Sequence, residues 1–162
     1  DKQLSLAVGT TVLALVGLFN IAGTYLAGLL GGRMAKPLLL TMIYALRAVA
    51  IALFVLLPIS PWSAYAFGIV MGLLWLSTVP LTNGVVLTVF GIRNMSMLAG
   101  TVFLFHQIGA FFGGWLGGYL YDATGSYDTV WLIAIGLSIV AALLNLPIRE
   151  VPVARLKAVG AS

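Results

Sequence analysis

Five long apolar stretches fill almost the whole of this 162-residue chain and limit what it can fold into. They cover residues 4–30, 37–57, 62–90, 97–121 and 129–146. About 20 helical residues cross a bilayer core about 30 Å thick, and four stretches reach that length while the last comes close. Spanning strands would be shorter and would alternate in polarity. The sequence therefore predicts an all-α, polytopic bundle of five transmembrane helices.

The composition excludes several other classes of protein. Hydrophobic residues make up 62% of the chain and charged residues 7%, whereas soluble domains carry about 25% charged residues. There is no cysteine, so neither a disulfide framework nor a thiolate metal site can form. The sequence also lacks metal-ligand spacings, a nucleophile beside a base, and a phosphate-binding loop. We therefore expect no enzyme, no cofactor and no metal.

The basic residues indicate topology rather than nucleic-acid binding. If each stretch crosses once, six Lys and Arg residues fall on one side and only Lys2 on the other. By the positive-inside rule the carboxyl terminus is cytoplasmic and the amino terminus lies outside, in the inner (plasma) membrane. The six residues on the cytoplasmic side are Arg33, Lys36, Arg93, Arg149, Arg155 and Lys157.

Short connections between the stretches predict one compact helical bundle over residues 1–148. The basic tail, residues 149–162, is expected to be partly disordered at the cytoplasmic surface. Five crossings place the chain ends on opposite sides of the membrane. We therefore expect the chain to be part of a larger carrier and to need that carrier's N-terminal helices as partners in transport.

Two features of the third and fourth stretches concern helix shape and packing. Pro80 removes a backbone hydrogen bond inside the third stretch, which predicts a kink that is either a hinge or a static bend. In the fourth stretch, small residues recur every four positions, which lets helix backbones approach closely. This pattern fits ordinary helix packing or an interface that rocks between two halves. The two rows are Gly109, Gly113 and Gly117, and Ala110, Gly114 and Gly118.

Polar residues inside the stretches are the candidate solute and proton sites. Arg47 lies at the middle of the second stretch, where an arginine must be compensated by an anion, an acidic partner or backbone carbonyls. His106 could couple protons to transport or donate a hydrogen bond to solute, or it could be a satisfied buried histidine. Gln107, Asn20 and Asn83 either line a polar path or bond neighbouring helices.

Four segments resemble the carboxyl-terminal part of major facilitator superfamily transporters, most closely the bacterial monocarboxylate-transporter-like branch. They are residues 17–25, 44–47, 75–84 and, most specifically, 106–128 (HQIGAFFGGWLGGYLYDATGSYD). The resemblance covers residues 4 to about 148 and implies that the five spans are helices 8 to 12 of twelve. It also implies alternating access around a midplane site near the third and fourth spans. The second span is usually peripheral in that family, which disfavours Arg47 as a direct ligand.

Two departures from the family pattern leave the substrate open. Gly32 stands where the family's cytoplasmic loop motif has an acid, and the first span lacks the arginine that carboxylate carriers use. The spans, Arg47 and His106 near the middle of their spans, and the resemblance together predict a secondary transporter of a small, anionic organic solute. Proton coupling through His106 is an option. The alternatives are a non-transporting membrane subunit and, less favoured, a membrane-embedded enzyme.

Overall fold

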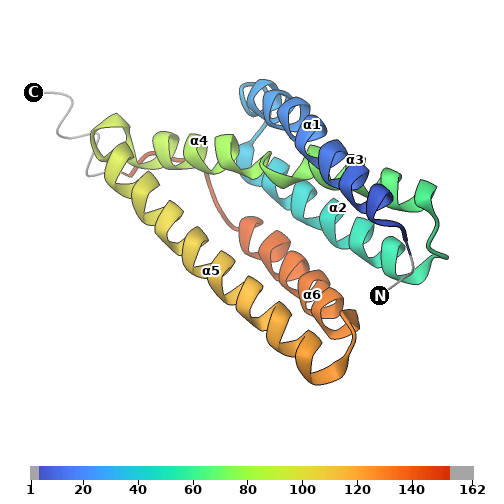
Figure 1. Cartoon of the computed structure of the whole chain (residues 1–162). Coiled ribbons are helices and arrows are strands. Elements are labelled where there is room, and N and C mark those ends of the chain that lie inside the picture. Colours follow the sequence, from blue (N-terminus) through green and yellow to red (C-terminus); the bar gives the residue numbers. More distant parts are fainter. Residues whose placement is uncertain (1–3, 154–162) are drawn as a thin grey trace, which may run out of the picture.

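The computed structural model describes residues 4–153, and these residues form an all-α bundle (Figure 1). Five helical segments are long and apolar enough to cross a membrane, which confirms the predicted fold class. Six α-helices and one short 3-10 turn make up these segments. In chain order they are α1 (Leu6–Gly31), α2 (Lys36–Leu56), α3 (Pro61–Trp75), α4 (Thr78–Phe90), η1 (Ile92–Asn94), α5 (Met95–Thr124) and α6 (Asp128–Asn145).

The helices begin and end where local chemistry allows it. Ser5 accepts a hydrogen bond from the Val8 amide at the start of α1, and Ser60 and Ser63 form a capping box before α3. Gly125 adopts a left-handed backbone (φ 69°) after α5 and donates its N–H to the Tyr121 carbonyl. Only glycine takes that conformation cheaply, so the chain can turn sharply into α6.

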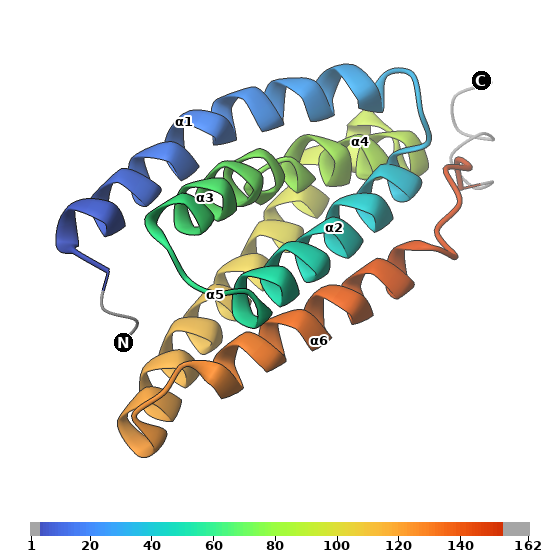
Figure 2. The same cartoon turned by 90° about the vertical axis from the view of Figure 1, so that its right-hand side faces the viewer.

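Two helix pairs form the packed part of the bundle. α1 lies along α3, and α2 lies along α6, as Figures 1 and 2 both show. The buried cluster Ala27, Leu39, Leu40 and Leu81 joins α1, α2 and α4 near one end. Most large apolar side chains point outward instead, for example Leu13 at 73% and Leu137 at 64% exposure. An outward apolar surface suits a lipid environment, in which exposed leucine carries no penalty.

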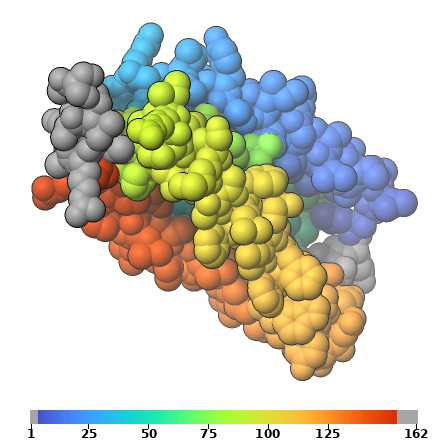
Figure 3. All heavy atoms as spheres, turned by 90° about the vertical axis from the view of Figure 1, so that its left-hand side faces the viewer, coloured from blue at the N-terminus to red at the C-terminus, as the bar shows by residue number. Residues whose placement is uncertain are grey.

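α5 stands apart from this packed region. It has no buried residue and makes only sparse contacts with α4 and α6. The space-filling view in Figure 3 shows α5, in yellow, running across the outside of the molecule.

The third predicted span, residues 62–90, is one membrane-length segment, and its helix is interrupted close to the kink expected at Pro80. α3 ends at Trp75 and α4 begins at Thr78, a few residues before Pro80. In an α-helix the ring of Pro80 would clash with the carbonyl of Leu76, four positions earlier, so the helix stops there. Pro80 itself sits in the first turn of α4, where a missing N–H is tolerated.

The segment after α6 bonds to two helices of the bundle. Glu150 bonds to the start of α2, and the Val153 amide donates to the Val89 carbonyl at the end of α4, 3.0 Å away. Residues 149–153 thus contact the bundle, whereas residues 154–162 of the tail lie outside the described part of the chain, so its partial disorder stays a prediction.

Candidate functional site

The break between α3 and α4 brings together polar groups from three helices. Arg47 of α2 donates through Nη2 to the carbonyl oxygens of Leu74 and Trp75, at 2.7 and 3.1 Å. These carbonyls belong to the last turn of α3. The last carbonyls of a helix have no N–H donor within the helix, and their partial negative charge favours a cation. The arginine therefore satisfies the end of α3 that the break exposes.

Two further contacts hold the broken backbone. The Leu76 amide donates to Oδ1 of Asn20, on α1, at 3.0 Å. The Ser77 hydroxyl donates to the carbonyl of Leu73, one turn earlier in the chain. Backbone groups freed inside a membrane must find such partners, because lipid offers none. Arg47, Asn20 and Ser77 together supply them.

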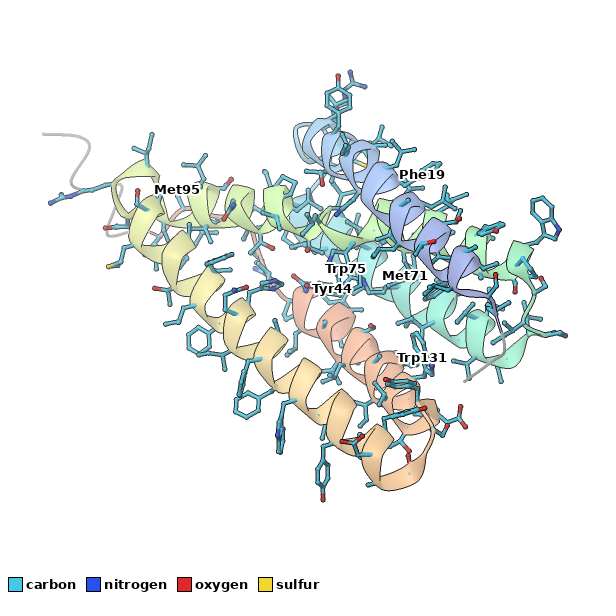
Figure 4. All side chains as sticks on the ribbon, in the orientation of Figure 1. Phe19, Tyr44, Met71, Trp75, Met95 and Trp131 are labelled. Atoms are coloured by element: carbon cyan, nitrogen blue, oxygen red, sulfur yellow. The ribbon has the colours of Figure 1, made fainter. Side chains whose placement is uncertain are left out.

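Arg47 also packs against an aromatic ring from its own helix. Its guanidinium carbon lies 5.2 Å from the centre of the Tyr44 ring, within the range of a cation–π contact. Figure 4 labels Tyr44, on α2, and Trp75, the last residue of α3, near the middle of the molecule. Of the predicted ways to compensate Arg47, the structure contains the carbonyl contact. The Nε atom is buried and has no partner among the described residues.

Glycines hold α1 close enough to α3 for Asn20 to reach Leu76. A Cβ atom placed on Gly72 would lie 2.7 Å from the Val16 carbonyl oxygen and 3.0 Å from the Phe19 Cβ. A Cβ atom on Gly23 would overlap the backbone of Leu73. Small residues allow this approach, and it is the tightest helix contact that the glycines of the described residues show.

His106 and Gln107 lie elsewhere, on exposed turns of α5. The His106 ring stacks on Phe103 at 6.4 Å and forms no hydrogen bond within the described part of the chain. The predicted glycine rows have open space around them, since a Cβ atom on Gly109, Gly113, Gly114, Gly117 or Gly118 would meet nothing within 4 Å. Within residues 4–153 these rows are not a packed interface.

Asn83 is half-buried on α4, less than two turns from the break. Its side chain makes no hydrogen bond to another described residue. The structure thus brings Arg47, Asn20 and Pro80 to one place, sets Asn83 near them, and leaves His106 and Gln107 on a separate helix.

Sequence reasoning missed an ion pair at the other end of the bundle. Nζ of Lys36 lies 3.1 Å from Oε1 of Glu150, and the Lys36 amide donates to Oε2 at 3.3 Å. The stem of Lys36 covers Gly84, where a Cβ atom would lie 2.6 Å from the lysine Cδ. The only signal in the sequence was a lone acid after the last span, 114 positions from its partner.

A bundle of membrane-length helices with one broken span defines a multi-pass membrane protein. The family model of the Major Facilitator Superfamily matches residues 1–161, and the chain belongs to that superfamily. No curated protein and no solved structure matches the chain.

Membership implies a secondary transporter that contacts the lipid bilayer and carries a solute. The superfamily consists mostly of transporters, which agrees with the expectation that this chain is not an enzyme.

Proposed function

We propose that this chain forms part of a carrier that moves a small, anionic organic solute across the inner (plasma) membrane by alternating access. The superfamily match supports a secondary transporter, and the broken third span supports movement. Discontinuous helices near the membrane midplane commonly form the solute sites of secondary transporters.

The observation that carries the anionic preference is the sign of charge inside the spans. Arg47 and His106 lie within membrane-spanning helices. The acids among the described residues, Asp122, Asp128 and Glu150, lie at or beyond helix ends. In a low-dielectric interior such an imbalance favours an anion. Arg47 contributes through its field and its hold on α3, because its donors already bind carbonyls.

The uncovered surface of α5 fits the remaining part of this proposal. His106 and Gln107 are exposed on this helix, and a Cβ atom on the glycines of its rows would meet nothing within 4 Å among the described residues. In the complete carrier we place this face against other helices of the same protein, with the five spans as helices 8 to 12 of the monocarboxylate-transporter-like branch. The charge distribution supports a cytoplasmic carboxyl terminus.

The test is solute uptake by the full-length carrier in proteoliposomes. Small carboxylates and their uncharged amides are compared as substrates, and we expect saturable uptake of the carboxylates alone. Equal uptake of the amides would reject the anionic preference. Uptake of neither series would reject small carboxylates as the solute class.

The same assay tests proton coupling. Proton-coupled uptake of a carboxylate should become faster when the external pH is lowered below the internal pH, because the proton gradient then drives the solute inward. The His106→Ala carrier should lose most of this dependence. An unchanged rate and pH profile would remove His106 from the proton path.

A further inference from the structure

A cavity lies away from the break, where α2 and α6 meet the segment that follows α6. Its volume is about 410 Å³, and its lining includes Leu38, Thr41, Asn145, Leu146, Arg149 and Glu150. Figure 2 shows α2 and α6 side by side, with the chain after α6 rising past the start of α2. The cavity therefore sits at the end of the bundle that carries Arg33 and Lys36 in the first connection.

The two charged residues of the cavity wall are in different situations. The carboxylate of Glu150 is already bound by the side chain and the amide of Lys36, at 3.1 and 3.3 Å. Arg149 is exposed and makes no ion pair or side-chain hydrogen bond to any described residue. The cavity thus presents a cation whose neighbouring acid is neutralised by another lysine.

Apolar side chains surround this cation on the membrane side. Leu38 of α2 is 48% exposed and Leu146, after α6, is 60% exposed, and both line the cavity. A ligand that fills this space must combine a negative head with an apolar tail. Basic pockets between transmembrane helices on the cytoplasmic side bind anionic headgroups in this way.

We propose that this cavity binds the phosphate of an anionic phospholipid from the cytoplasmic leaflet. Arg149 pairs with the phosphate, the Asn145 and Thr41 side chains border the headgroup, and Leu38 and Leu146 contact the start of an acyl chain. A free phosphate ion would use only the first of these contacts. A phosphatidylcholine headgroup would place a cation near Arg149 and bind less well.

The experiment measures lipid binding to the purified chain in detergent by native mass spectrometry. Phosphatidylglycerol, phosphatidylcholine and inorganic phosphate are titrated separately. In Arg149→Gln we expect the affinity for phosphatidylglycerol to fall about fivefold, the effect of one basic residue near a lipid surface. The matched control is Arg33→Gln, which removes an equally exposed cation at the same end but outside the cavity and should change the affinity less than twofold.

Two further variants keep the test decisive if Arg149→Gln does not fold. Arg149→Lys should retain most of the binding, and Leu38→Trp should weaken it by filling the cavity while every charge stays. Equal losses in Arg149→Gln and Arg33→Gln would mean general surface attraction and overturn the site. Inorganic phosphate binding as tightly as phosphatidylglycerol would overturn the lipid assignment.

Discussion

α3 and α5 both carry glycines four residues apart, but the two helices have opposite surroundings. Gly68 and Gly72 of α3 lie against α1, where a Cβ atom would come within 3.0 Å of Val12 and 2.7 Å of Val16. The longer rows of α5 face open space within the described residues. The same spacing thus marks a packed contact in one helix and an unused surface in the other.

The comparison suggests that the α1–α3 region and α5 have different roles. α1 and α3 pack closely against each other, and Asn20 of α1 reaches the break, where Arg47 also binds. The polar and small residues of α5 do not pack against other helices of the described residues. We interpret the break between α3 and α4 as a joint, which α1 and Arg47 hold in place. We interpret the exposed face of α5 as the face toward the solute path and the other helices.

The largest expected effect comes from adding one methyl group to each glycine row. Gly72→Ala should lower the free energy of unfolding by about 3 kcal/mol, because the new atom meets the backbone of α1 and neither helix can easily move. Gly113→Ala should change it by about 0.5 kcal/mol or less in this chain. Denaturation in detergent, followed by circular dichroism, measures both.

The same pair of variants in the full-length carrier sharpens the comparison. If α5 packs against other helices there, Gly113→Ala becomes destabilising as well. Equal stabilities for the two variants in the 162-residue chain would break the distinction between the helices.

A smaller effect is expected at the joint. Arg47→Gln removes the guanidinium donor to Leu74 and Trp75 and should cost about 2 kcal/mol, mainly because the part-buried Leu74 carbonyl loses its charged partner. Arg93→Gln, in the exposed turn η1, is the matched control and should be close to neutral. A folded, fully stable Arg47→Gln protein that loses only anion transport would show that Arg47 is a ligand instead.

The smallest effect is expected at Asn20. Asn20→Leu keeps the size of the side chain and removes the acceptor for the Leu76 amide, at a cost of about 1 kcal/mol. Hydrogen exchange of the Leu76 amide should rise in this variant while the Gly91 amide, bonded to Leu87, stays protected. Unchanged protection at Leu76 would mean that the backbone of the break is held by other groups.

The spans were predictable because membrane-length apolar runs carry a strong signal, and all five predicted ranges agree with the helical segments to within a few residues. Pro80 signalled the break, which falls at Leu76 and Ser77 because proline affects the carbonyl four positions earlier. The partners of Arg47 are backbone carbonyls. Every residue has one, so no residue type in the sequence marks which carbonyls Arg47 binds.

Long-range contacts were the other limit. Nothing in the spacing of Gly68 and Gly72 or of the α5 rows tells which helix lies opposite. The pairing of Lys36 with Glu150 depends on how α2 and the segment after α6 meet, which is a property of the folded bundle.

The most direct test of the α3–α4 break is pulsed electron paramagnetic resonance on the proposed complete carrier in lipid nanodiscs. One pair of spin labels at Trp62 and Leu87 spans the break, and a second pair at Leu13 and Trp62 spans the α1–α3 contact; this chain contains no cysteine that would interfere. Alternating access around the joint predicts a broad or two-peaked distance distribution for the first pair and one narrow peak for the second. A single narrow peak for both pairs, unchanged between pH 6 and 8 and on adding the transported carboxylate, would contradict it.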